Sequence, residues 1–394
     1  MRVSSALRAA LEARSVSGWA CYAARRMQPR DLLAQLLRPA GGGIYVVSTG
    51  ASEQLAMQER LYGVTGEAEV RRRFAEELDR IAAARVVVLG VPSDVGAGFL
   101  RGSNMGPQAI RAALLQTHPS WPAEARDLGV VDAGDVLVTP QLLHDEMLSA
   151  GQIRASQDAL YPSLDEAARR AMPVSPLSME SRALEAILAI NPDAKPLVLG
   201  GDHSCAWPVV ETLANARREP WGIVQIDAHT DLLKERLGVR YCFATWSYHA
   251  NELLGRGGRL VQVGIRATRH DRGHWEGSLG VRQFWARECL ADPSAALDAI
   301  VAHVERTGVR SIYFSNDIDG TDARFADATG TPEAGGLAPD FVLELIRRLQ
   351  ARVGLCAGDV MEVAPAIPRT PGGRERTLET AVRYFRETAI ALAS

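Results

Sequence analysis

Three short stretches of the sequence contain carboxylates and imidazoles at spacings that suit metal binding. They read GGDHS (200–204), DAHTD (227–231) and SNDIDGTD (315–322). The side chains of interest are His203, Asp227, His229, Asp231, Asp317 and Asp319. Hard oxygen donors combined with imidazole nitrogen suit Mn²⁺, Co²⁺ or Ni²⁺ and argue against a structural zinc site, which prefers cysteine.

The number of carboxylates indicates two metal ions. Four carboxylates around one divalent ion would leave excess negative charge, whereas two such ions balance them. Two ions roughly 3.5–4 Å apart can activate one water as a nucleophile at neutral pH. Each stretch alone has an ordinary explanation, such as a helix cap at Asp202 or an exposed loop. Their combination in one chain favours a binuclear metal site.

Apolar, β-branched segments precede these stretches and predict strands. The expected strands are 85–91, 196–201, 221–227, 259–265, 311–317 and 354–360. The expected helices include 69–84, 179–191, 294–308 and 339–354. Near-continuous apolar strands that alternate with helices predict a parallel sheet covered on both faces. Such sheets bind ligands beyond the carboxyl ends of their strands, so His203, Asp227, Asp317 and Glu362 should lie at one edge.

Composition excludes several classes of partner. The chain has 394 residues, and its net charge of −3 gives no general attraction to nucleic acid or to an anionic membrane. No apolar stretch approaches the roughly 20 residues that span a bilayer. The five cysteines lack CxxC spacing and indicate reduced thiols in a cytoplasmic protein.

The amino-terminal region differs from the rest of the chain. The first 40 residues hold seven arginines and only two acids. This bias can mark a transit peptide, but we favour either a start at Met27 or an extension that stabilises an oligomer. We therefore predict an N-terminal extension over residues 1–68 and a catalytic domain over residues 69–394.

The three stretches resemble the signature blocks of the ureohydrolases, the arginase and agmatinase family. The third block continues as SNDIDGTDARFADATGTPEAGGL (315–337). The resemblance extends to GVPSDVGAGFLRGSNMGPQAIR (90–111), DLGVVDAGDV (127–136) and GDVMEVAPA (358–366), and covers about residues 85 to 390. It implies an arginase-like three-layer α/β/α fold with a mostly parallel central sheet, to which the N-terminal extension is added.

The resemblance also implies roles for individual residues. The six side chains named above would hold two divalent ions, with Asp231 and Asp317 as bridging carboxylates. Asp231 would also move a proton during the reaction, and Asp202 would support His203. Glu362 matches the carboxylate that binds the substrate guanidinium, and a carboxylate suits a planar cation because it accepts two parallel hydrogen bonds.

The implied reaction is hydrolysis of a guanidino compound to urea and an amine or ammonia, and two departures from the family pattern narrow the substrate. Leu233 stands where arginases place the asparagine that reads the α-carboxylate. If it is buried, an amino-acid carboxylate stays unpaired, so arginine is a poor candidate. Phe243 stands near the place of a proton-shuttling histidine. His249, six residues further on, is a candidate for that catalytic role, and it is equally well explained as a helix-face residue.

Aromatic residues after the DAHTD stretch predict a small pocket. Phe243 and Trp246 are expected to line the substrate site, although ordinary packing under the loop is the alternative. A small pocket that lacks a residue to bind a substrate carboxylate favours free guanidine. The extension and the RYCFATW loop (240–246) also resemble the guanidine hydrolase branch, which uses nickel. The expected cofactors are two divalent ions per subunit, with Ni²⁺ favoured and Mn²⁺ as the alternative.

Other functions stay open at this point. Agmatinase or guanidinobutyrase activity is the main alternative, with formimidoylglutamate hydrolysis behind it. A non-catalytic homologue that acts as a binding or scaffold protein is the alternative from another class. The resemblance further implies a homo-oligomer, a trimer or a homohexamer, and a metal-delivery chaperone is a candidate partner.

Overall fold

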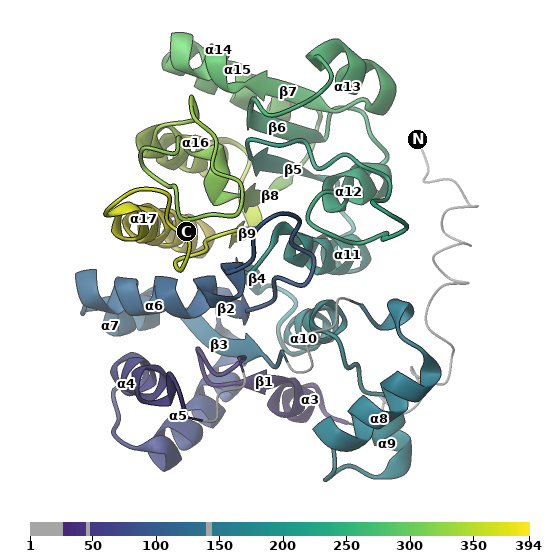
Figure 1. Cartoon of the computed structure of the whole chain (residues 1–394), viewed down its shortest axis with the longest axis vertical. Helices are drawn as coiled ribbons and strands as arrows, with labels where there is room; N and C mark the ends of the chain where they lie inside the picture. The colour runs from purple at the N-terminus through teal and green to yellow at the C-terminus, as the bar shows by residue number, and fades with distance from the viewer. Residues whose placement is uncertain (1–26, 45–47, 139–143) are drawn as a thin grey trace.

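A nine-stranded sheet with helices on both faces forms the core of the part of the chain that the computed structural model describes, residues 27–44, 48–138 and 144–394 (Figure 1). Most of the arginine-rich segment considered as a transit peptide, residues 1–26, lies outside the described residues. The strands are β1 (Leu37–Arg38), β2 (Val86–Val91), β3 (Val130–Val136), β4 (Lys195–Gly200), β5 (Trp221–Ile226), β6 (Leu260–Ile265), β7 (Arg282–Trp285), β8 (Ser311–Asn316) and β9 (Leu355–Val360). The helices are α3 (Pro29–Leu36), α4 (Ala51–Tyr62), α5 (Glu67–Arg80), α6 (Gly106–Thr117), α7 (Trp121–Leu128), α8 (Ala150–Leu160), α9 (Glu166–Arg170), α10 (Pro176–Ile190), α11 (Ala206–Ala216), α12 (Trp246–Leu254), α13 (Arg272–Leu279), α14 (Ala286–Ala291), α15 (Pro293–Arg306), α16 (Pro339–Arg352) and α17 (Gly373–Ala393).

The sheet is almost entirely parallel. Its strand order is β1-β3-β2-β4-β9-β8-β5-β6-β7, and the pair β1–β3 is antiparallel while the other neighbouring pairs are parallel. Helices α6, α15, α16 and α17 lie on one face and α10, α11 and α12 on the other (Figure 1). This arrangement confirms the predicted three-layer α/β/α fold with a mostly parallel central sheet.

The six strands expected from apolar runs are present as β2, β4, β5, β6, β8 and β9, with ends within one residue of the prediction. Strand β3 was not expected because Asp132 and Asp135 interrupt its apolar pattern. The buried guanidinium of Arg111 pairs with Asp132 at 2.8 Å and with Asp135 at 2.5 Å, which compensates the carboxylates inside the sheet.

Residues before the predicted domain boundary pack onto the sheet. Helix α3 buries Leu33 and Leu36 against α10, and β1 extends the sheet beside β3. Met57 of α4 belongs to the same apolar core. The boundary at residue 68 stays a prediction, but the described residues before it contribute to the core on one side of the sheet.

The strand order brings the predicted site residues together. Strands β4, β9, β8 and β5 are consecutive neighbours in the sheet. His203, Glu362, Asp317 and Asp227 follow these four strands, in that order. Because parallel strands end at the same edge, the four side chains meet beyond the carboxyl ends. Within the described ranges, no helix has the length and apolar character that a membrane crossing requires.

Candidate metal centre

Two groups of potential ligand atoms lie at this edge of the sheet, and they share one residue. His203, Asp227 and Asp231 form one group, and Asp227, His229 and Asp319 form the other. Within each group the ligand atoms lie within 4.8 Å of one another. Asp227 is common to both groups and Asp231 belongs to one of them, while the bridging roles expected for Asp231 and Asp317 stay predictions.

His203 is, with Asp227, among the most deeply buried of the candidate ligands. It begins a short 3₁₀ turn, η4 (His203–Cys205), directly after β4, and it is fully buried. Its Nδ1 lies 3.0 Å from Asp317 Oδ2, 3.3 Å from Asp227 Oδ2 and 3.5 Å from Asp231 Oδ2. Its Nε2 lies 2.9 Å from the Ser315 hydroxyl. The hydroxyl thus fixes the ring so that Nδ1 faces the acids, as is usual for metal-binding histidines.

His229 lies on the side of the cluster that faces solvent, with 29% of its side chain exposed. Its Nδ1 lies 3.0 Å from Asp319 Oδ2 and 3.6 Å from Asp227 Oδ1. Its Nε2 lies 3.9 Å from Glu333 Oε1, and the Thr331 hydroxyl donates a 3.0 Å hydrogen bond to Asp319 Oδ2. Thr331 and Glu333 therefore connect the second group to the solvent-facing opening of the site, its mouth.

Two residues of the site adopt left-handed backbone conformations that side chains rarely tolerate. Asp231 has φ +52° and Glu362 has φ +64°. Such strain costs of order 1–3 kcal/mol and persists where the surroundings hold it. In Glu362 the backbone is held by a 2.8 Å hydrogen bond from its N–H to the Gly201 carbonyl. The strain is therefore located at two carboxylates of the site.

The acids and imidazoles of the cluster shift one another's pKa values. Burial and neighbouring carboxylates raise the pKa of Asp231 and that of Asp317 well above the usual carboxyl range. Burial alone would lower the pKa of His229, but the carboxylates of Asp319 and Asp227 raise it to about 12. Positive charge therefore stabilises the cluster, and the oxygen and nitrogen donors converge on the same small volume. This donor set fits hard divalent cations.

Asp202 supports His203 through the backbone rather than through the imidazole. Its Oδ1 accepts a 2.9 Å hydrogen bond from the N–H of Ser204, which caps η4. Its Oδ2 accepts a 2.9 Å hydrogen bond from the N–H of Gly96. Asp202 thus ties the turn that carries His203 to the loop after β2.

Trp246 was expected to line the substrate site, and the structure places it against two of the candidate ligands, so contact with a substrate stays a prediction. Its side chain is fully buried, and its ring lies 4.5 Å from that of His203, centroid to centroid. Its Nε1 donates a 3.0 Å hydrogen bond to Asp231 Oδ2. Trp246 therefore packs behind the ligands and orients one of them.

Replacing Trp246 by phenylalanine should weaken metal binding about 10- to 100-fold, because Asp231 loses the donor that orients it. Metal titration of the purified protein measures this effect. Trp275→Phe is the matched control, since Trp275 Nε1 donates to the Thr268 hydroxyl at 3.0 Å and not to a ligand. Equal metal affinity in wild type and in Trp246→Phe would contradict the orienting role.

His249, a predicted catalytic residue, is not brought to the cluster. Its Nε2 lies 3.1 Å from the Lys234 carbonyl oxygen and 3.2 Å from that of Arg240. Its ring packs against those of Trp207 and Tyr241. These contacts place it as a residue that holds the loop before α12, and its catalytic role stays a prediction without geometric support.

Leu233 and Phe243 occupy the loop between β5 and α12. Leu233 is 45% exposed, so the argument from a carboxylate left unpaired in a buried place does not apply, although its side chain offers no donor to a carboxylate. The Phe243 ring packs against Gly98, where an added Cβ would lie 2.2 Å from Phe243 Cζ. Phe243 therefore contacts the loop after β2 instead of the ligands.

Glu362 lies beside the ligands, as predicted. It is 6% exposed, and its Oε1 accepts a 3.0 Å hydrogen bond from the backbone N–H of His203. Its other oxygen, Oε2, faces Gly330, where an added Cβ would lie 3.7 Å away. One oxygen thus fixes the carboxylate to the turn of a ligand, and the other faces Gly330, which lines a surface depression.

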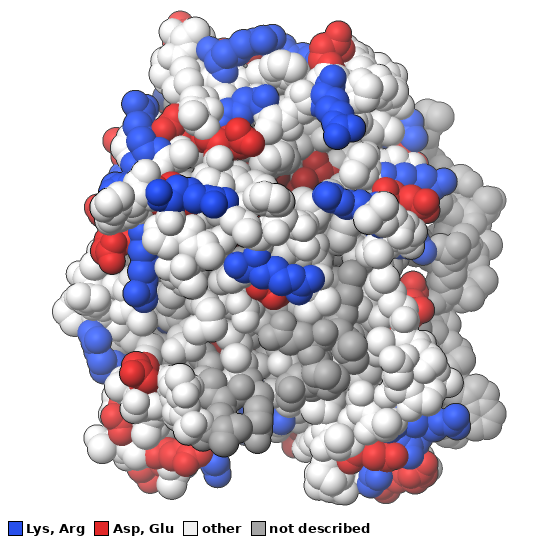
Figure 2. Space-filling view, in the orientation of Figure 1, with Lys and Arg blue, Asp and Glu red and all other residues white. Residues whose placement is uncertain are grey.

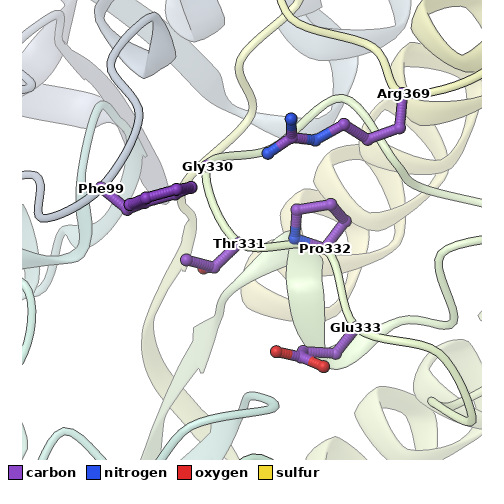
Figure 3. A pocket seen from close by; sticks show the side chains of 6 residues that line it. All are labelled: Phe99, Gly330, Thr331, Pro332, Glu333 and Arg369. Carbon is purple, nitrogen blue, oxygen red and sulfur yellow. The ribbon is translucent and has the colours of Figure 1, made fainter.

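A depression of about 420 Å³ leads to the second ligand group (Figure 3). Its lining residues are Phe99, Gly330, Thr331, Pro332, Glu333 and Arg369. Figure 2 shows acidic atoms in a hollow near the middle of this face, with basic side chains around it. Thr331 and Glu333 lie within the third sequence block but received no role from it. Nothing in the sequence pattern marked Phe99, Arg369 or Ser315.

Comparison with known proteins agrees with this geometry. Residues 84–391 match the model of the arginase family. The chain is 33% identical over 284 residues to a mitochondrial guanidino acid hydrolase of Homo sapiens, covering 70% of each chain. It is 30% identical over 302 residues to a guanidinobutyrase of Pseudomonas aeruginosa, covering 75% of this chain and 82% of that protein. The structure resembles that of a hypothetical agmatinase from Burkholderia thailandensis, with a TM-score of 0.60, 28% identity and coverage of 79% and 87%. With a family match over most of its length and the ligand clusters in place, the chain belongs to the arginase family.

Proposed function

We propose that this protein hydrolyses a small guanidino compound to urea, and that free guanidine is its first substrate, with ammonia as the second product. The observation that carries the proposal is the position of Glu362. This buried carboxylate accepts the backbone N–H of His203 through one oxygen, and its other oxygen faces Gly330, which lines the depression. A planar guanidinium held there would lie beside both ligand groups.

The six candidate ligands are proposed to hold two divalent cations, Ni²⁺ first and Mn²⁺ as the alternative. Bound cations would supply Lewis-acid activation of a water. Glu362 would bind and orient the guanidinium, and Asp231 would accept a proton from the attacking water and pass it to the departing nitrogen. Trp246 would keep Asp231 Oδ2 in place for this transfer. The buried walls around His203 would exclude other water from the reacting carbon.

The preference for free guanidine rests on the aromatic residues near the mouth. Phe243 packs against the loop that carries Phe99, and Phe99 lines the depression. Leu233 offers no hydrogen-bond donor for an amino-acid carboxylate. Free guanidine carries no alkyl chain, so it needs neither space beyond the mouth nor a residue that binds a carboxylate.

A guanidino acid is the second candidate, and Arg369 favours it. This arginine is exposed and lines the same depression as Glu333. Its guanidinium could pair with a substrate carboxylate, whereas it would repel the ammonium tail of agmatine. The relatives named guanidino acid hydrolase and guanidinobutyrase support this alternative. We therefore place a guanidino acid before agmatine.

Substrate competition tests the proposal. The protein is loaded separately with Ni²⁺ and Mn²⁺, and urea release is measured from guanidine, 4-guanidinobutyrate, agmatine and arginine. We expect the highest kcat/KM for guanidine and the lowest for arginine. Faster turnover of 4-guanidinobutyrate would favour the second candidate. An absence of urea from all four compounds with either metal would favour the scaffold alternative.

Assembly, metal delivery and location complete the proposal. We place the protein in the cytoplasm as a trimer or hexamer, with a chaperone as the source of metal. The cysteines within the described ranges, Cys205, Cys242, Cys289 and Cys356, are buried and free, which supports a reducing compartment. Light scattering of the purified protein tests the assembly.

A further inference from the structure

We propose that Phe99 is a specificity-determining residue that closes the mouth to guanidino compounds with a long tail, and that Phe243 positions it through Gly98. The inference rests on the proposed function and deepens it, because it names the tail as the feature that the protein rejects. It gives a role to the exposed residue Phe99 and to Phe243, which stands near the place of the histidine found in better-known relatives.

Phe99 is a large apolar side chain left in contact with water. It is 78% exposed, and it lines the depression across from Arg369. Figure 3 shows its ring and the guanidinium of Arg369 approaching from opposite sides, with Gly330 between them and Thr331 and Pro332 below. A single exposed apolar residue is ordinary on a surface. At the entrance to a site, the same ring limits what can pass.

The contact between Gly98 and the Phe243 ring fixes the backbone next to Phe99. An added Cβ at Gly98 would lie 2.2 Å from Phe243 Cζ, so only glycine leaves room for the ring. The Phe243 backbone N–H donates a 3.2 Å hydrogen bond to the Gly96 carbonyl. The guanidinium of Arg236 lies over the Phe243 ring, 5.0 Å from its centroid. Phe243 is therefore held from two loops, and it supports the backbone one residue before Phe99.

The loop that carries Phe99 is also tied down on both sides of it. Asp202 accepts the N–H of Gly96 at 2.9 Å, and Asp94 accepts the N–H of Gly102 at 2.7 Å. The Leu100 carbonyl lies next to Gly330, where an added Cβ would be 3.1 Å from it. Because Glu362 Oε2 also faces Gly330, the loop places Phe99 close to the proposed guanidinium site.

Substrate geometry follows from this placement. A guanidinium bound by Glu362 must direct any tail out through the depression that Phe99 and Arg369 line. Free guanidine has no tail and meets no obstacle. A chain of three or four methylenes must pass the Phe99 ring or displace it, which lowers its affinity.

Four variants test the inference: Phe99→Ala, Phe243→Ala, the double variant, and Leu237→Ala as the control. Leu237 is 98% exposed on a neighbouring loop and does not line the depression. The measured quantity is kcat/KM for 4-guanidinobutyrate and for agmatine, each divided by that for guanidine. Phe99→Ala should raise both ratios about tenfold or more, mainly through a lower KM. Phe243→Ala should raise them less, and Leu237→Ala should leave them unchanged.

The double variant shows whether Phe243 acts by positioning Phe99 or whether its loss loosens the loop in general. If Phe243 acts through Phe99, the double variant should gain less than the product of the two single changes. Calorimetric binding of 4-guanidinobutyrate provides a second readout, with tighter binding expected in Phe99→Ala. Where Phe243→Ala fails to fold, Phe243→Leu replaces it.

Three results would overturn the inference: unchanged ratios in Phe99→Ala, an equal rise in Leu237→Ala, or independent effects of the two phenylalanines. Its failure is distinct from failure of the proposed function. Wild type that releases no urea from guanidine refutes the proposed function, and the length effect is then read from 3-guanidinopropionate against 4-guanidinobutyrate.

Discussion

Replacing Asp317 by asparagine should abolish urea release and lower the bound metal content. Asp317 Oδ2 lies 3.0 Å from His203 Nδ1, and its Oδ1 accepts a 2.9 Å hydrogen bond from the N–H of Asp319. Asparagine keeps the shape and can still accept that hydrogen bond, so the main change is the lost negative charge. Replacing a residue that only hydrogen-bonds to a metal ligand lowers metal affinity by up to roughly 100-fold. Removing the charge of a ligand itself should lower metal affinity by more than that.

Elemental analysis after metal loading and desalting measures the first effect, and a urea assay measures the second. Asp327→Asn is the matched control, because Asp327 is equally buried but its Oδ2 accepts a hydrogen bond from the Thr370 hydroxyl, whereas Asp317 Oδ2 faces His203. It should retain wild-type metal content. Full metal content in Asp317→Asn would refute the assignment of Asp317 as a ligand.

Replacing Glu362 by glutamine should lower kcat/KM for guanidine by about 100-fold without loss of metal. The amide oxygen can still accept the N–H of His203, as Oε1 does at 3.0 Å. The substrate cation, however, would meet a neutral amide in place of a carboxylate. Loss of one member of a buried charged pair costs about 2–5 kcal/mol, and each 1.4 kcal/mol is tenfold.

A second buried glutamate serves as the control for this prediction. Glu180 of α10 is fully buried, and burial raises its pKa well above the usual range, but neither of its carboxyl oxygens bonds to the turn that carries His203. Glu180→Gln should therefore keep kcat/KM near the wild-type value. An equal loss in both variants would show that Glu362→Gln acts through the fold. Unchanged kcat/KM in Glu362→Gln would refute its contact with the substrate.

The fold was predictable where local pattern decides it. Apolar β-branched runs specify buried parallel strands, so six of the strands were placed to within one residue. Strand β3 was missed because Asp132 and Asp135 interrupt its apolar pattern. Their charges are neutralised by Arg111, a residue distant in sequence that no local pattern reveals. Strand β7 has four residues, too few for a clear pattern.

By itself, the sequence determined the chemistry of the site. Carboxylates and imidazoles placed after strands that end at one edge must converge, because parallel strands direct their carboxyl ends the same way. Only the tertiary structure decided that Asp227 is shared, that Trp246 lies behind Asp231, and that His249 faces backbone carbonyls. These outcomes depend on irregular loops, whose course follows from contacts between distant residues and leaves no periodic signal. The mouth formed by Phe99 and Arg369 is decided in the same way.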